Sequence, residues 1–475
     1  MGRMGVLLIG SALALAPVLA FAQAPDDPRL AALEARLQAL EAEAAALRAQ
    51  AESAAAALSA TRAELQAIRE ARAEVASGSV PPSDPATTTA AVDFNSAVAL
   101  PGSAPASPLP APVPAPAGAN GNAFNPAINL ILIGSYGAHS IEPERLQRSG
   151  FPFVGEGGPP EQGFSLGESE LSFAANIDDK FYGQFTLALG AEGSDTELGI
   201  EEAYIETNAL PGGFTLRTGR FFSNLGYLNS HHTHTDRFFD RPLVYQALLG
   251  NQYLDDGVQL RWVAPTDLFV ELGGEVFRGG NFPAGGARRD GAGVKTAFAH
   301  VGGDLGTEHS WLAGISVLDA KTADAADGFS GDNTLYIADA TWKWAPQGNF
   351  SDSGITLRGE FVLDDRNGQF HDALDPGRDQ DWIGQRRGAY LEGVYRINRR
   401  WETGYRYDQL WADAEGPFAS THDPKRHSLM LTWLNSEFSL LRLQLARELA
   451  SAGQSDESLT LQYQMSLGAH GAHKF

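Results

Sequence analysis

Cysteine is absent from this chain of 475 residues, which excludes a disulfide framework, thiol chemistry and zinc sites built on Cys. Positive charge is scarce, because 35 Lys and Arg face 58 Asp and Glu and leave a formal net charge of −23. A chain this acidic lacks the basic footprint that a nucleic-acid partner requires. After Leu19 no run of about twenty apolar residues occurs, so we expect no membrane-spanning helix.

Motifs that usually accompany catalysis are missing as well. The chain has no phosphate-binding Gly-Lys-Ser/Thr loop and no His-Glu-x-x-His zinc helix. Ser230 and His231 are adjacent, but neighbouring residues at a strand end point apart and make a poor nucleophile–base pair. We therefore predict a protein without a catalytic step.

The N-terminal third of the chain divides into segments of different composition. Residues 1–22 have the layout of a secretory signal peptide, with an apolar stretch from Val6 to Leu19 and the small-x-small sequence Ala20-Phe21-Ala22. Residues 76–124 are rich in Pro, Ala and Ser and have few large apolar side chains, so they are predicted to be an extended linker.

Residues 28–75 carry apolar side chains at alternating spacings of three and four. These are Leu30, Leu33, Leu37, Leu40, Ala44, Leu47, Ala51, Ala54, Leu58, Thr61, Leu65 and Ile68. A period of 3.5 residues held without drift predicts an α-helical coiled coil, placed in the periplasm, that oligomerises or tethers the protein. The alternative is a single amphipathic helix lying on another surface.

Behind residue 125, short segments of alternating apolar and polar residues are separated by connectors that are long and short in turn. The long ones are 140–164, 190–199, 230–254, 279–293, 321–334, 365–380, 412–425 and 450–456. The short ones include Asp178-Asp179, Pro265-Thr266-Asp267 and Asn398-Arg399-Arg400. About eight long and seven short connectors predict about sixteen antiparallel strands over residues 126–475, an all-β transmembrane barrel of the outer membrane.

Alternation within the segments predicts which face meets lipid. Val258, Leu260 and Trp262 fall on one face of a strand, while Gln259 and Arg261 fall on the other. The same pattern runs through Leu459, Leu461, Tyr463, Met465 and Leu467. We expect the apolar face to contact outer-membrane lipid and lipopolysaccharide, and the polar face to line a water-filled lumen.

One strand and turn resemble a known family of porins. The segment 216–225 with Gly226 resembles the Gly-Arg-Phe…Phe-Gly strand and turn of phosphate-selective porins of the O/P type, as does Glu202-Ala203-Tyr204-Ile205. The resemblance implies a sixteen-strand homotrimer and is compatible with an N-terminal coiled coil. Three other stretches look closer to a poorly characterised porin-like group sometimes labelled metal-regulated or receptor-like. They are 124–128, 166–170 and the small residues Gly468, Ala469, Gly471 and Ala472 before the terminal His-Lys-Phe. The final Phe475 resembles the signal by which the barrel assembly machinery recognises its substrates.

Phosphate selectivity is not expected to carry over, because it needs a ladder of lumenal Arg and Lys. The predicted acidic lumenal residues are Glu168, Glu170, Glu202, Glu206, Glu271, Glu275 and Glu402. The predicted basic ones are Arg217, Arg261, Arg406 and Arg442. This excess of acidic over basic side chains in the predicted lumen favours the passage of cations over anions. A receptor driven from the inner membrane is not expected either, because a helix and a linker stand where a folded plug would be needed.

The third long connector has the densest cluster of chemically active residues. They are His231, His232, His234, Asp236, Arg237, Asp240 and Arg241, and large apolar residues follow them up to Leu249. Such apolar residues indicate a loop folded into the barrel as a constriction. His231, His234 and Asp236 are candidate ligands for Zn²⁺ or Cu²⁺. The alternative is that they are polar loop residues near the pore mouth.

Acidic connectors offer a second candidate cation site. Asp319, Asp324, Asp327 and Asp332 precede Asp364, Asp365, Asp372, Asp375, Asp379 and Asp381. These side chains suit Ca²⁺ and would bridge lipopolysaccharide phosphates, although the spacing does not match an EF-hand and a solvated acidic face is the alternative.

The prediction that unites these features is an outer-membrane porin. It would pass small polar or cationic solutes by diffusion through a water-filled barrel that an inserted loop narrows. No cofactor is required. One alternative is an outer-membrane protein that binds or takes up zinc or copper. Another is an envelope tether in which the coiled coil contacts the cell wall.

Overall fold

The computed structural model describes residues 126–468, except for 193–194, 209, 287–290 and 373–374. The predicted signal peptide (1–22), coiled coil (28–75) and linker (76–124) lie outside these residues, as does Phe475. Those assignments stay predictions.

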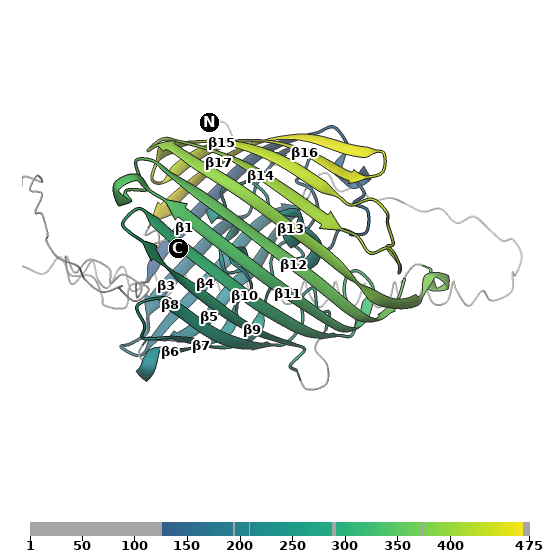
Figure 1. Ribbon diagram of the computed structural model, residues 1–475, viewed down its shortest axis with the longest axis horizontal. Helices are drawn as coiled ribbons and strands as arrows, with labels where there is room; N and C mark the ends of the chain where they lie inside the picture. The colour runs from purple at the N-terminus through teal and green to yellow at the C-terminus, as the bar shows by residue number, and fades with distance from the viewer. Residues whose placement is uncertain (1–125, 193–194, 209, 287–290, 373–374, 469–475) are drawn as a thin grey trace, which may run out of the picture. The chain divides into compact units, whose positions relative to one another are not determined.

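In the described residues the strands form one antiparallel sheet that closes into a barrel (Figure 1). From β3 onward each strand pairs with the next along the chain, and β17 pairs with β1 to complete the ring. The sheet has seventeen strands, but β2 and β3 pair with successive parts of β1 and share one place, so the described barrel has sixteen strand positions. The predicted fold class is confirmed.

The first half of the ring consists of β1 (Ala127–His139), β2 (Gly163–Ser165), β3 (Ser169–Asn176), β4 (Phe181–Glu192), β5 (Asp195–Thr207), β6 (Phe214–Phe222), β7 (Leu254–Val263), β8 (Phe269–Phe277) and β9 (Val294–Leu305). The second half consists of β10 (His309–Thr322), β11 (Phe329–Trp344), β12 (Gly354–Phe370), β13 (Gln380–Asn398), β14 (Trp401–Trp411), β15 (Lys425–Ser436), β16 (Ser439–Ser451) and β17 (Gln454–Gly468).

Helices are short throughout the described residues. They are η1 (Pro143–Arg145), η2 (Pro211–Gly213), η3 (Leu228–Ser230), η4 (Thr233–Thr235), α2 (Leu243–Leu249), η5 (Pro346–Gly348) and η6 (Pro376–Arg378). Within that part of the chain, none is long and apolar enough to cross a membrane.

The two faces of the barrel have opposite polarity. On β17 the side chains of Leu459, Leu461 and Tyr463 are exposed on the outer face, whereas Thr460 and Gln462 are buried on the inner face. Because strand residues alternate between faces, the predicted assignment of apolar residues outward and polar residues inward is confirmed along this strand. The arrangement is the inverse of a water-soluble fold, in which apolar residues fill the core.

Some connectors predicted to be long are strand instead. β4 and β5 run to Glu192 and from Asp195 into the predicted connector 190–199, and only residues 452 and 453 separate β16 from β17 in 450–456. β12 likewise extends to Phe370, inside 365–380. The prediction took polar composition for irregular backbone, but strands can pair through polar residues because the ladder uses main-chain groups.

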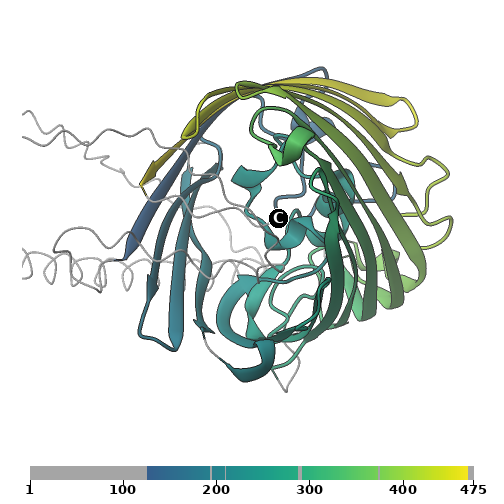
Figure 2. The same ribbon diagram turned by 60° about the vertical axis from the view of Figure 1, so that its left-hand side comes forward.

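The longest described connectors are 140–162 and 223–253. Residues 223–253, which we call the inner loop, join β6 to β7 and contact the inner faces of strands around the barrel. Figure 2 looks into the ring and shows this teal segment among the strands. All seven residues of α2 within it are buried. The apolar composition of the third connector thus reflects burial inside the barrel.

Candidate functional site

The carboxylate of Glu360, on the inner face of β12, accepts several hydrogen bonds from the inner loop. Glu360 of β12 accepts hydrogen bonds from the backbone N–H groups of Tyr227 (3.0 Å) and Leu228 (3.1 Å). It also accepts from the hydroxyls of Tyr245 in α2 (2.8 Å) and Tyr390 in β13 (2.7 Å). A buried carboxylate needs such donors to offset the loss of water. Glu360 therefore ties the start of the loop and α2 to the same place.

Two glycines allow the inner loop to approach strands β12 and β13 closely. Gly226 has φ of +59°, and a Cβ there would lie 2.2 Å from Glu360 Oε2. On β13 a Cβ at Gly388 would lie 2.5 Å from Val244 Cγ2. Glycine at these positions allows the loop turn and α2 to pack against the strands.

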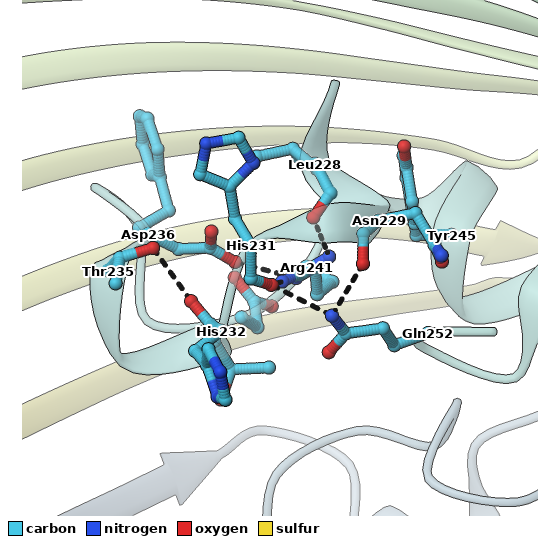
Figure 3. Close-up of polar contacts among 12 residues, drawn as sticks. Leu228, Asn229, His231, His232, Thr235, Asp236, Arg241, Tyr245 and Gln252 are labelled. Carbon is cyan, nitrogen blue, oxygen red and sulfur yellow. Dashed lines mark hydrogen bonds and ion pairs between the residues drawn. The ribbon is translucent and has the colours of Figure 1, made fainter. Parts of the chain in front are cut away.

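The loop is also braced internally (Figure 3). Arg241 donates to the carbonyl of Leu228 at 2.8 Å and to that of His231 at 2.5 Å. Gln252 donates to the carbonyls of Asn229 (2.7 Å) and His231 (2.8 Å). These bonds satisfy carbonyls of η3 and of His231, the residue that follows it. They hold the His-rich segment in one conformation.

The inner faces of β12 to β16, which we call the arginine wall, hold one side of the loop through ion pairs. The wall carries Arg358, Arg366, Arg386, Arg396, Arg406, Arg426 and Arg442, with Glu360, Asp364, Glu392, Glu402, Asp408 and Glu448 among them. Asp240 of the loop pairs with Arg406 (3.0 Å) and Arg426 (2.6 Å). Burial acts to raise the pKa of Asp240, but Arg426 and Arg406 outweigh it and hold the pKa at about 2.

Other loop residues contact the same wall. Arg237 lies 3.0 Å from Glu402, and Arg442 donates to the carbonyls of Asp236 (2.7 Å) and Phe238 (3.2 Å). Because guanidinium groups stay charged at any physiological pH, these contacts do not depend on protonation of a base.

The inner faces of β3 to β8, which we call the acidic wall, have a different balance. They carry Glu170, Glu201, Glu202, Glu206, Glu271 and Glu275, with Arg217 and Arg261 as their basic residues in the described chain. Arg217 and Arg261 both pair with Glu206, at 2.6 and 3.1 Å. Glu271 pairs with His300 of β9, and Glu275 accepts from the backbone N–H of Asn224. These side chains face the inside of the barrel.

A β-bulge directs two successive carboxylates inward. In the β4–β5 ladder Thr186 is paired with Glu202 and Leu187 with Ile200, so Glu201 is the extra residue. Both Glu201 and Glu202 are consequently buried on the inner face. Strict alternation would have placed one of them outside, and a bulge re-aims side chains in this way.

These carboxylates surround two histidines of the loop. His232 Nδ1 lies 3.0 Å from Glu170 Oε2 and 3.2 Å from Glu201, and its Nε2 lies 3.0 Å from Glu202. His234 Nδ1 lies 2.7 Å from Glu170 Oε1. Burial acts to lower the pKa of His232, but the three carboxylates outweigh it and raise the pKa well above the ordinary value.

The predicted metal ligands are not all brought together. His231 stacks on Tyr227 with ring centroids 4.5 Å apart, and its Nδ1 lies 2.7 Å from the Tyr227 carbonyl oxygen. Asp236 pairs with Arg241 at 2.6 Å. Of the set His231, His234 and Asp236, only His234 faces the acidic wall, where Glu170 and His232 join it. Neighbours in a 3-10 segment point in different directions, and the sequence alone could not show which ones converge.

Three aspartates of the predicted Ca²⁺ set, Asp327, Asp364 and Asp372, pair with arginine in the described residues. Asp327 and Asp364 are buried against Arg366 at 2.6 and 3.1 Å, and Arg386 lies 2.8 Å from Asp364. Asp372 pairs with Arg378. Arginine supplies the positive charge that the prediction assigned to Ca²⁺ at these positions.

One motif that the sequence contains without its usual context is Gly-x-Ser-x-Gly at residues 163–167. Ser165 ends the short strand β2, and β3 follows it in the described chain. A nucleophile elbow needs a strand-to-helix turn, so Ser165 does not occupy one.

Several residues that hold the loop were missed. Glu360, Asp408 and Arg426 face the lumen, and Asp408 accepts from the backbone N–H of Leu243 at the start of α2. The period-2 alternation of β12 through β15 was the signal available to find them. Glu201 had no such signal, because the bulge breaks that period.

Comparison with known proteins gives fold-level likeness. No protein-family model matches the chain. An uncharacterised protein of Aquifex aeolicus is 29% identical over 393 residues, which cover 74% of this chain and 80% of that protein. Neither this match nor the solved structures test the resemblance to phosphate-selective or metal-regulated porins.

Three solved structures are similar in fold. OmpT, an outer membrane protein of Vibrio cholerae, has a TM-score of 0.47 and 12% identity over 73% of this chain and 99% of its own. The outer membrane channel DcaP of Acinetobacter baumannii has a TM-score of 0.47 and 13% identity over 72% and 97%. OmpF of Salmonella typhi has a TM-score of 0.48 and 9% identity over 73% and 99%. At this level of likeness they carry no argument about function.

Proposed function

We propose that the chain is an outer-membrane porin through which small polar solutes diffuse. The observation that carries the proposal is the inverted polarity of a closed barrel, with apolar side chains outside and charged ones inside. An apolar exterior is stable against hydrocarbon, and closure leaves no strand edge unpaired in lipid. A charged interior is stable where water and ion pairs solvate it. Such a molecule conducts without any chemical step.

The inner loop narrows the route in this proposal. Among inner-facing charges, the side chains that keep most exposure include Arg237 at 34%, His232 at 22% and Arg261 at 21%. Arg237 and His232 are basic residues of the loop, so in this proposal passing ions meet positive charge on the loop beside the carboxylates of the acidic wall. The acidic wall and the net charge of −23 favour cations.

The proposed burial of the outer face in the membrane is tested by introducing a charge at two different depths. Leu260, an outward residue in β7, and Leu305, at the turn end of β9, are both exposed. We expect Leu260→Arg to cost about 2 to 4 kcal/mol of unfolding free energy in lipid vesicles, and Leu305→Arg between about 0 and 1 kcal/mol. Urea titration of both variants measures this. Equal small costs would contradict burial of the outer face in hydrocarbon.

Channel function is tested in a planar bilayer. We expect ohmic conductance for the wild-type protein and a reversal potential of cation-favouring sign under a KCl gradient. Absence of conductance from correctly folded protein would overturn the porin proposal.

Assembly and envelope roles belong to the same proposal. Homotrimer formation, contact with lipopolysaccharide, recognition of Phe475 by the assembly machinery and anchoring by the coiled coil rest on the sequence. Deletion of residues 28–75 tests the coiled coil. Loss of envelope cohesion with conductance intact would favour the tether as a second role, and loss of trimers on non-denaturing gels would assign it to oligomerisation.

A further inference from the structure

We propose that Glu170, His232 and His234 form a binding site for a divalent transition-metal ion of the Zn²⁺ type, which fastens the inner loop to the acidic wall. One carboxylate oxygen and two imidazole nitrogens, one from each residue, lie within 4.8 Å of one another. The three residues come from β3 and from the loop around η4. A bound ion would therefore bridge two segments that are 62 residues apart at their nearest ligands.

The donor set fits the chemistry of such an ion. Two imidazoles and one carboxylate are a common zinc ligand set, and a fourth position stays available for water. With metal–ligand bonds of about 2.0 to 2.1 Å, donors in a tetrahedral site lie roughly 3.3 Å apart. His232 Nδ1 and His234 Nδ1 lie 3.0 and 2.7 Å from Glu170. The three donor atoms, which lie within 4.8 Å of one another, would move to about 3.3 Å apart when an ion binds.

The histidines are oriented by groups outside the ligand set. With an ion on His232 Nδ1, the opposite nitrogen Nε2 is placed to donate to Glu202 Oε2 at 3.0 Å. Metal-bound histidines usually donate their second N–H to a carboxylate in this way. Between the two histidines, Thr233 donates to Glu168 at 3.1 Å. The ring centroids of His232 and His234 lie 5.4 Å apart.

The negative charge around the three ligands favours a bound cation. Glu168, Glu170, Glu201 and Glu202 converge on this part of the loop. In the described chain, the ion pairs of Glu170 and Glu201 are made with histidine alone, whereas carboxylates across the barrel pair with arginine. A dication offsets two of these negative charges. His232 keeps part of its surface exposed, which gives the ion a way in from the lumen.

The test is isothermal titration calorimetry of full-length protein folded in detergent and freed of metal by chelation, with Zn²⁺ as the probe. We expect about one ion per chain for the wild type, and loss of that binding in the double variant His232→Ala/His234→Ala. His231→Ala is the matched control in the same segment and should keep the site, because its ring stacks on Tyr227.

Folding of each variant is checked by circular dichroism. Glu202→Gln keeps all three ligands and is expected to weaken Zn²⁺ binding by about 10- to 100-fold with unchanged stoichiometry. This variant keeps the test decisive if the double variant fails to fold. The inference is overturned if the wild type binds no Zn²⁺, if Glu202→Gln binds as tightly as the wild type, or if His231→Ala removes binding.

A competition arm separates a built site from a loose acidic cluster. Excess Ca²⁺ or Mg²⁺, which prefer oxygen donors, should leave Zn²⁺ bound. Displacement by Ca²⁺ would overturn the assignment to a transition metal. The inference does not rest on the porin proposal, since conductance without Zn²⁺ binding defeats only the metal site, and Zn²⁺ binding without conductance defeats only the channel.

Discussion

The inner loop has two attachments that differ in chemistry. Toward the arginine wall, Asp240 pairs with Arg406 and Arg426, and Arg237 pairs with Glu402. Toward the acidic wall, the ion pairs of the loop are histidine to carboxylate, above all His232 and Glu170. Guanidinium and carboxylate keep their charges across the physiological range, whereas an imidazole binds a proton or a metal ion depending on conditions.

The difference separates a permanent attachment from a conditional one. Removing one partner of a buried ion pair leaves a charge without compensation, so the arginine side should resist changes of solution and be sensitive to mutation. The acidic side has a surplus of carboxylates, so its strength should follow the cation that occupies it. A loop held in this way keeps its fold while one edge responds to ions.

The largest effect is expected from Asp240→Ala. The substitution leaves Arg406 and Arg426 buried without their shared partner, and we expect a loss of about 3 to 5 kcal/mol of unfolding free energy. The matched control is Asp256→Ala, which removes the more exposed pair with Arg220 and should cost between about 0 and 1 kcal/mol. Denaturant titration in lipid measures both. Similar costs would show that the arginine wall does not hold the loop.

A somewhat smaller effect is expected from Glu360→Gln. An amide oxygen cannot accept all four hydrogen bonds, and its NH₂ group would face the N–H of Tyr227 or Leu228. We expect a loss of about 2 to 3 kcal/mol and larger single-channel conductance as the loop loosens. Tyr390→Phe removes one of the four donors and should cost about 1 kcal/mol. Unchanged conductance in Glu360→Gln would show that the packing of the inner loop does not set the width of the diffusion route.

The barrel was predictable from the sequence because its signals are local. Alternation such as that from Leu459 to Tyr463 needs only neighbouring residues, and turn residues mark where strands reverse. Connector boundaries were wrong at 190–199 and 450–456, because composition does not tell polar strand from loop. Strand count survived this error, since a strand that is longer than predicted is still one strand.

The site was predictable only in part. The apolar residues after residues 231–241 were the basis for predicting that segment inside the barrel, and alternation was the basis for predicting Glu170, Glu202 and Arg217 on the inner face, where these three side chains are buried in the structure. The pairing of His232 with Glu170 depends on how a 3-10 turn packs against a strand distant in sequence. Inward placement of Glu201 depends on a bulge in the β4–β5 ladder. Contacts that depend on the packing of distant segments or on a local bulge leave no periodic pattern in a single sequence.

The pH dependence of the arginine side sharpens the comparison. Burial acts to raise the pKa of Asp240, but Arg426 and Arg406 bring it from 3.8 to about 2. A carboxyl whose pKa is depressed in the folded state contributes stability above its unfolded pKa and loses it as the pH falls through the folded pKa. The unfolding free energy of the wild type minus that of Asp240→Asn should be constant above about pH 5. It should fall by about 2 kcal/mol between about pH 4 and pH 2. A fall that begins near pH 6 would mean that a histidine on the acidic side governs both attachments.

The smallest effect is expected from neutralising Arg237. Its side chain is one-third exposed, and its partner Glu402 keeps a second pair with Arg396, so Arg237→Gln should leave stability nearly unchanged. A unit charge about 7 Å from a passing ion contributes roughly 0.6 kcal/mol in water, which is about a threefold change in local ion concentration. We therefore expect Arg237→Gln to increase the preference for cations over anions by at most about threefold, and the reversal potential under a KCl gradient measures this change. The shift should shrink as total salt rises, because salt screens the charge. Glu206→Gln on the acidic wall should move the potential the opposite way, and His427→Gln on the outer face of β15 should not move it. If Arg237→Gln and His427→Gln behave alike, ions do not pass beside the loop, and the route lies elsewhere in the barrel.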